Sequence, residues 1–197
     1  MKSRYDDPRF DDVTCVSPLL GGPTFALRFR LMRLAWLIAW RCLAAWTPSP
    51  FHPWRNRLLR LFGAKLDPTA IVHGTTSIWW PGNLIMGPNA SMGPGVICYN
   101  VAPVTLEALA IVSQRAHLCT GTHDIHRAGF PLVSRAIVLR RKCWIAAEAF
   151  VGPGTVVGEG AVLGARGVAV KPLAPWTVYV GNPARAVAGR RHEDDAA

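Results

Sequence analysis

The chain has 197 residues, of which half are hydrophobic and 17% are charged, and its formal net charge is +10. This length fits one domain with short appendages, and the apolar fraction excludes a mainly disordered chain. The 18 Gly and 16 Pro residues also exclude a plain helical bundle. The basic charge favours a polyanionic partner, which leaves nucleic acid, an anionic membrane face and phosphate-bearing small molecules open.

Residues 1–24 are expected to form an N-terminal tail. They carry aspartates and lack the apolar run of a secretory signal, which predicts a cytoplasmic protein. The longest uninterrupted apolar run, Leu34–Trp40, is too short to cross a membrane. The five cysteines form no CxxC pair, so neither a disulfide framework nor a structural zinc site is expected.

Residues 25–63 predict a helical extension rich in Arg and Trp. The stretch Phe25–Trp46 lacks Gly and Pro, prolines follow it, and a second short helix from Trp54 to Phe62 is expected to end at Gly63. Apolar residues surround most of the first helix, which favours packing on the main domain or on a neighbouring subunit.

The alternative for this extension is contact with a membrane. The sequence contains no acidic residue between Asp12 and Asp67, and Arg with Trp and Leu is typical of a helix lying on a bilayer surface. On this interpretation residues 25–62 bring the protein to the anionic inner face of the membrane as a peripheral partner.

Residues 64–180 repeat with a period of six. Small residues occur four places after the aliphatic ones, and the frame continues upstream, where Leu118 and Thr122 fill the two positions. A six-residue period fits neither a helix nor a simple strand, and it predicts an all-β solenoid of about five triangular coils. The aliphatic positions from residue 139 onward are Leu139, Ile145, Val151, Val157, Leu163 and Ala169.

The frame breaks after His123 and resumes at Leu139. We therefore expect residues 124–138 to form a protruding loop, and an excursion from a regular wall is where a functional site is expected. Residues 181–197 are expected to form a C-terminal segment and tail.

The repeat resembles that of the hexapeptide-repeat acyltransferases. Three segments make the chain similar to the colanic-acid-biosynthesis and nodulation-type O-acetyltransferases within that family: Leu118–Asp124 (LCTGTHD), Trp144–Gly154 and Gly181–Arg185. This resemblance implies a left-handed parallel β-helix and an acetyl-CoA-dependent O-acetyltransferase that acts on a sugar or lipid-linked saccharide in surface polysaccharide biosynthesis. It also implies a homotrimer in which two subunits share each active site.

The resemblance also assigns roles to residues. His123 takes the place of the family's catalytic histidine, whose imidazole accepts the hydroxyl proton of the acceptor during direct transfer. Asn100 and Asp124 are the candidate substrate ligands. Acetyl-CoA is expected over the C-terminal coils, with candidate contacts at Trp144, the backbone amides around Ala146 and Gly164, and the basic side chains of Arg166, Lys171 and Arg185. The alternatives are that Trp144 packs on the wall and that the three basic side chains are solvated at the surface.

Two other classes of function remain open. A zinc enzyme resembling the γ-class carbonic anhydrases needs three histidines on one metal. His117 and His123 are six residues apart and are expected on successive faces of the triangle, so no metal is predicted. The other class is a non-catalytic scaffold or binding protein. Nucleic acid is not an expected partner, because no recognition helix, RNP-type strand or zinc finger stands out.

Overall fold

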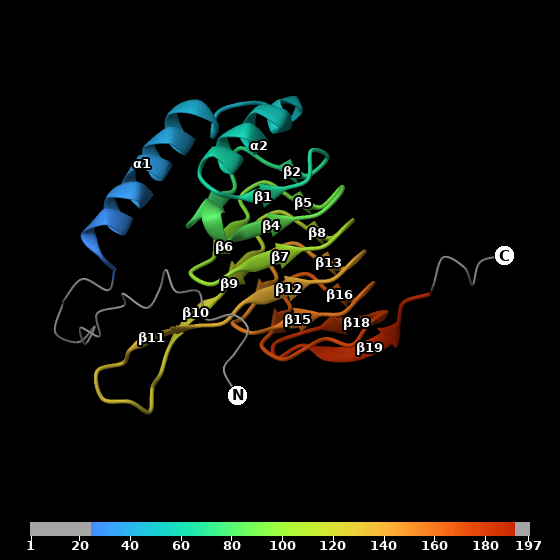
Figure 1. Ribbon diagram of the computed structural model, residues 1–197. Coiled ribbons are helices and arrows are strands. Elements are labelled where there is room, and N and C mark those ends of the chain that lie inside the picture. The colour runs from blue at the N-terminus through green and yellow to red at the C-terminus, as the bar shows by residue number, and fades with distance from the viewer. Residues whose placement is uncertain (1–24, 192–197) are drawn as a thin grey trace.

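The computed structural model describes residues 25–191. Three parallel sheets form the walls of a β-helix, and helices cover its N-terminal end (Figure 1). The helical part consists of α1 (Leu27–Leu43), a 3-10 turn η3 (Ser49–Phe51) and α2 (His52–Leu61). The predicted helical extension is confirmed. As expected, the second helix ends before Gly63, whose φ of 95° suits glycine.

Each coil contributes one short strand to each wall. The first wall contains β1 (Lys65–Leu66), β4 (Leu84–Met86), β7 (Val104–Leu106), β12 (Ile137–Leu139) and β15 (Val156–Val157). The second contains β2 (Ile71–Val72), β5 (Ser91–Met92), β8 (Ile111–Val112), β13 (Trp144–Ile145), β16 (Val162–Leu163), β18 (Thr177–Val180) and β19 (Arg185–Gly189). The third contains β3 (Ser77–Ile78), β6 (Ile97–Tyr99), β9 (His117–Cys119), β14 (Phe150–Val151) and β17 (Val168–Ala169).

The predicted left-handed parallel β-helix is confirmed, with five complete coils and the beginning of a sixth. Aligned residues lie 20 positions apart in the first coils, where Lys65 pairs with Ile85, but 18 apart later, where Val138 pairs with Val156. The longer coils have extra residues at the corner after the third wall. In the first coil these form the 3-10 turn η4 (Pro81–Asn83), so the strict period of six is interrupted at this corner.

One aliphatic side chain per six-residue unit fills the interior, as predicted. The six repeat residues from Leu139 to Ala169 are all buried, and the small corner residues that follow them let the chain turn. Thr122 is an exception to the predicted frame, because it is exposed and lies outside the walls. Its size fits the repeat, but the chain has already left the wall at this point.

The helices are attached to the first coil by hydrogen bonds to backbone carbonyls. The indoles of Trp36 and Trp40 on α1 donate to the carbonyls of Ile78 and Thr76 at 2.8 and 3.1 Å. The fully buried Arg55 on α2 donates to the Val72 carbonyl at 2.7 Å. One face of the extension therefore packs on the main domain.

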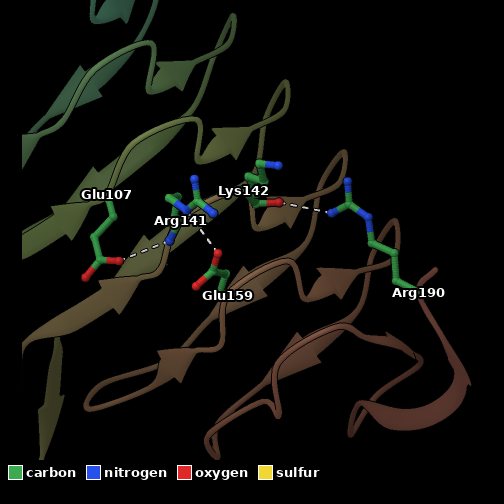
Figure 2. Close-up of polar contacts among 5 residues, drawn as sticks. All are labelled: Glu107, Arg141, Lys142, Glu159 and Arg190. Carbon is green, nitrogen blue, oxygen red and sulfur yellow. Dashed lines mark hydrogen bonds and ion pairs between the residues drawn. The ribbon is translucent and has the colours of Figure 1, made fainter. Parts of the chain in front are cut away.

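The C-terminal segment returns along the solenoid. Strand β19 pairs antiparallel with β18, and Arg190 then donates to the carbonyls of Lys142 and Gly160, each at 3.0 Å. Beside this contact, the carboxylate of Glu107 accepts a hydrogen bond from the backbone N–H of Arg141. The side chain of Arg141 donates to the carboxylate of Glu159 (Figure 2). The Arg190 hydrogen bonds fasten the end of the chain to earlier coils, and the Arg141 contacts join three of those coils to one another.

Candidate active site

A β-hairpin interrupts the β-helix between β9 and β12. Its strands are β10 (Gly121–His123) and β11 (Leu132–Ser134), which pair antiparallel outside the three walls. The excursion therefore begins at Gly121 and not after His123, which corrects the predicted loop of residues 124–138. At Gly121 the chain passes so close to Tyr99 that a Cβ atom there would lie 2.9 Å from the aromatic ring.

His123 lies at the end of β10 with its side chain exposed. Its Nδ1 is 2.8 Å from the backbone carbonyl oxygen of Phe130 across the hairpin loop. A carbonyl oxygen only accepts hydrogen bonds, so Nδ1 carries the hydrogen and the neutral ring keeps a free lone pair on Nε2. The hairpin thus holds the imidazole in the tautomer that a general base requires.

The side chain of His123 borders a hollow of about 350 Å³, the hairpin hollow. Asp124 also lines it, but its Oδ1 accepts a hydrogen bond from the backbone N–H of His126 at 3.0 Å and so shapes the loop. Arg135, which the sequence reasoning missed, adds a positive charge to the hollow. It follows β11 directly, so the pairing of the hairpin strands is the signal that would have found it.

The structure contradicts the assignment of Asn100 as a substrate ligand. Its side chain is fully buried, its Oδ1 accepts from the Trp80 N–H at 3.0 Å, and its Nδ2 donates to the Trp80 carbonyl at 2.7 Å. Asn83 in turn donates to the Asn100 carbonyl. Asn100 therefore joins two coils at the long corner and cannot reach an acceptor.

The structure also corrects the two backbone amides assigned to acetyl-CoA. The Ala146 N–H donates to the Leu163 carbonyl at 2.9 Å, and the Gly164 N–H donates to the Tyr179 carbonyl at 2.7 Å. Both groups are thus occupied in the ladder between coils, because each begins the corner that follows a strand of the second wall.

Trp144 and Arg166 lie on the outer surface, where each has its own hydrogen-bond partner. Trp144 projects from the second wall, and its indole N–H donates to Ser113 Oγ at 2.9 Å. Arg166 Nε donates to Glu148 at 2.6 Å, and Arg115 pairs with the same carboxylate. The hydrogen bond from Arg166, together with the charges of both arginines, lowers the pKa of Glu148.

Lys171 and Arg185, by contrast, lie together. Both line a hollow of about 340 Å³ at the end of the solenoid, the C-terminal hollow, with Pro172, Tyr179 and Pro183 among its other residues. Lys171 follows β17, and the hairpin follows β9, two coils earlier on the same wall. With strands about 4.8 Å apart, the chain leaves the wall at points separated by about 10 Å along one edge.

The two histidines considered for zinc do not lie as expected. His117 remains in the third wall, where its ring packs against Phe150 and burial lowers its pKa. His123 lies in the hairpin, so its expected place on the next face of the triangle is wrong. Within residues 25–191, no three His, Cys, Asp or Glu side chains are grouped as metal ligands.

The chain resembles known proteins in sequence and in structure. No family model matches the sequence. It is 38% identical over 149 residues, covering 76% of this chain and 82% of the relative, to an Escherichia coli K12 protein named "Putative colanic acid biosynthesis acetyltransferase WcaF".

Two solved structures share the fold. A galactoside acetyltransferase in complex with coenzyme A has a TM-score of 0.77 at 20% identity and 88% coverage of both chains. A hexapeptide-repeat acetyltransferase from Vibrio cholerae in complex with acetyl coenzyme A has a TM-score of 0.73 at 17% identity, covering 85% of this chain and 91% of that one. The identity and coverage of the E. coli relative show the family, and the six-residue repeat and the β-helix agree with it. The chain belongs to the hexapeptide-repeat acetyltransferases.

Proposed function

We propose that the protein transfers an acetyl group from acetyl-CoA to a hydroxyl of a sugar or lipid-linked saccharide during surface polysaccharide biosynthesis, with His123 as the general base. The observation that carries the proposal is the bond between His123 Nδ1 and the Phe130 carbonyl, which leaves Nε2 free to accept a proton. The name of the E. coli relative supports the polysaccharide setting.

The proposed reaction needs one base and no acyl-enzyme. Nε2 of His123 takes the proton of the acceptor hydroxyl while its oxygen attacks the thioester carbon, so that a C–O bond forms and a tetrahedral oxyanion develops. The C–S bond then breaks, and the imidazolium returns the proton to the leaving thiolate. Arg135, in the same hollow, supplies positive charge beside the developing anion.

We further propose that Lys171 and Arg185 bind phosphates of acetyl-CoA. Their two charges converge on the C-terminal hollow, whose proline and tyrosine lining also suits an apolar part of the cofactor. The C-terminal hollow and the hairpin lie along the same edge of the solenoid, which favours one extended ligand that reaches both of them. Solved structures of the same fold hold acetyl coenzyme A or coenzyme A.

A homotrimer that completes the site between subunits is part of the proposal. The hairpin hollow is open, and His123 and Arg135 are exposed in the single chain. The outer faces of the walls also carry exposed large apolar side chains, which suit contact with another copy. These include Ile71, Ile85, Ile97, Ile111 and Trp144.

The activity is tested by release of coenzyme A thiol from acetyl-CoA in the presence of saccharides from the host's surface polysaccharide, with mass spectrometry of the products. We expect thiol release that depends on the acceptor and adds one acetyl group per molecule. If no saccharide, free or lipid-linked, is acetylated, the proposal fails and a non-catalytic scaffold is favoured.

Removing both charges of the C-terminal hollow should weaken binding of the donor more than turnover. For Lys171→Gln with Arg185→Gln we expect the KM for acetyl-CoA to rise about tenfold or more, with a small change in kcat, since charge-assisted hydrogen bonds to bound phosphates are lost. Arg57→Gln removes an exposed charge from α2 and serves as the control. An unchanged KM for acetyl-CoA in the double variant would exclude the assigned role.

A further inference from the structure

Helix α1 is apolar on two opposite sides. Its inner side carries Trp36 and Trp40, which are buried against the first coil. Leu27, Leu31, Leu34 and Ile38 recur at helical spacing on the other side, and each is more than half exposed. We call these four residues the outer stripe. The packing of α1 on the β-helix accounts for the inner side only, and Figure 1 shows the helix projecting beside the coils.

Positive charge borders the outer stripe. Arg30 and Arg41 are exposed and fall next to the stripe on the helical surface, and α1 and α2 contain no acidic residue. Two exposed tryptophans lie at the C-terminal end of α1, where Trp46 and Trp54 donate to the carbonyls of Cys42 and Leu43. An apolar stripe flanked by arginine and tryptophan is the composition of a helix in a membrane interface.

A hollow of about 300 Å³ opens beside the stripe, lined by Arg30, Arg33, Leu34, Leu37 and Trp79 together with Trp36. The Arg33 guanidinium lies 4.1 Å from the centre of the Trp79 ring and is held there as a cation–π pair. Two guanidinium groups above aliphatic side chains suit a ligand with a phosphate and a hydrocarbon portion, such as an anionic phospholipid.

A second copy of the chain is a less suitable occupant of this surface. Two stripes packed face to face would bring arginines of both copies together without a neutralising carboxylate. The acidic residues elsewhere in the described chain are few, and three of them already bind arginine. The acidic residues within residues 25–191 are Asp67, Glu107, Asp124, Glu148 and Glu159.

We propose that α1 docks on an anionic bilayer surface, with its outer stripe in the apolar boundary and Arg30, Arg33 and Arg41 on lipid phosphates. This inference goes beyond the proposed acetyl transfer and does not depend on it. Within residues 25–191 no helix is long and apolar enough to span a bilayer. At a rise of 1.5 Å per residue, α1 is about 25 Å long and would lie in the plane of the interface.

Docking would also place the hairpin near the membrane, because side-chain contacts connect it to α1. Phe29 of α1 and Trp79 pack at 5.6 Å between ring centres, and Trp79 and Tyr99 pack at 5.8 Å. Tyr99 in turn lies against Gly121, where β10 begins. A lipid-linked acceptor bound at the surface would therefore meet the side of the molecule from which His123 projects.

The test is co-sedimentation of the full chain with vesicles of phosphatidylcholine alone or mixed with phosphatidylglycerol. We expect binding to the mixed vesicles, little binding to phosphatidylcholine, and a fall in binding as salt is added. The variant Leu31→Gln with Ile38→Gln should lower the partition coefficient by about tenfold or more. Arg30→Gln with Arg41→Gln should reduce the preference for phosphatidylglycerol.

The matched control is Val187→Gln, which replaces an exposed apolar residue on β19 at the other end of the solenoid. It should bind as wild type does, and thermal unfolding should show that all variants are folded. The proposal is overturned if the wild-type chain ignores anionic vesicles, or if the stripe variant binds them equally well. Binding that appears only after deletion of residues 1–24 also overturns it for the full chain. A change of oligomeric state in the stripe variant, without vesicle binding by wild type, would assign the stripe to subunit contact.

Discussion

Replacing His123 by asparagine lowers kcat/KM for acetyl transfer by about 10²–10⁴-fold, the usual contribution of a general base. The asparagine amide retains a donor for the Phe130 carbonyl but has no group that accepts a proton near neutrality. The hairpin should therefore keep its geometry while the base is lost. Thiol release under saturating acetyl-CoA measures the effect, and thermal unfolding checks that the variant is folded.

A second histidine substitution separates this role from a general loss of an imidazole. His73→Asn, a histidine substitution in the first coil, is the control and should leave kcat/KM unchanged. A folded His123→Asn enzyme with the wild-type kcat/KM would remove His123 from catalysis.

Replacing Arg55 by methionine destabilises the protein by about 3–5 kcal/mol, because its buried acceptors lose charge-assisted hydrogen bonds worth about 1.5–3 kcal/mol each. The side chain of Arg55 is completely buried, and burial lowers its pKa. Its guanidinium donates to Thr47 Oγ1 at 2.8 Å and to the carbonyls of Pro48 and Ser49, both at 2.9 Å, in addition to the Val72 carbonyl. Methionine fills a similar volume but leaves the buried Thr47 hydroxyl and Val72 carbonyl without this donor, while the carbonyls of Pro48 and Ser49 are exposed enough to bind water.

Chemical denaturation followed by circular dichroism measures this loss. Arg57→Met on the same helix removes an exposed arginine and should change the free energy of unfolding by less than about 0.5 kcal/mol. Arg55→Lys should lie between the two, because an ammonium has three donors and cannot reach all the acceptors. A free energy for Arg55→Met within about 1 kcal/mol of wild type would mean that water replaces the guanidinium.

The repeat could be predicted from the sequence because each unit places one aliphatic residue in the interior, and that constraint recurs every six positions. The start of the hairpin could not, since Gly121 and Thr122 are small residues that also fit a corner of the repeat. Asn100 shows a different difficulty: a polar residue in an irregular stretch is compatible with binding substrate, yet it supplies backbone hydrogen bonds at a corner two residues longer than the later ones.

The sequence indicates candidate residues of the site, but not the backbone groups that orient them or occupy them. His123 and Asp124 line one hollow, and Lys171 and Arg185 line another because the chain reverses before β19. The Phe130 carbonyl that orients the imidazole is a backbone group with no signature in the sequence. The amides of Ala146 and Gly164 look available in a corner, but the neighbouring coil already accepts their hydrogen bonds.

The two covers of the solenoid determine how the molecule can associate. A stack of parallel strands presents unpaired backbone groups at each end, which act as templates for further strands and for fibre growth. At one end Asn56 and Arg55 on α2 donate to the carbonyls of Ala70 and Val72, and at the other β19 adds a strand of opposite direction that Arg190 holds in place. Growth along the axis is thus blocked at the first coil, and along the second wall the strand at the edge runs against the direction of the repeat. The lateral walls are the faces that remain for contact with another copy.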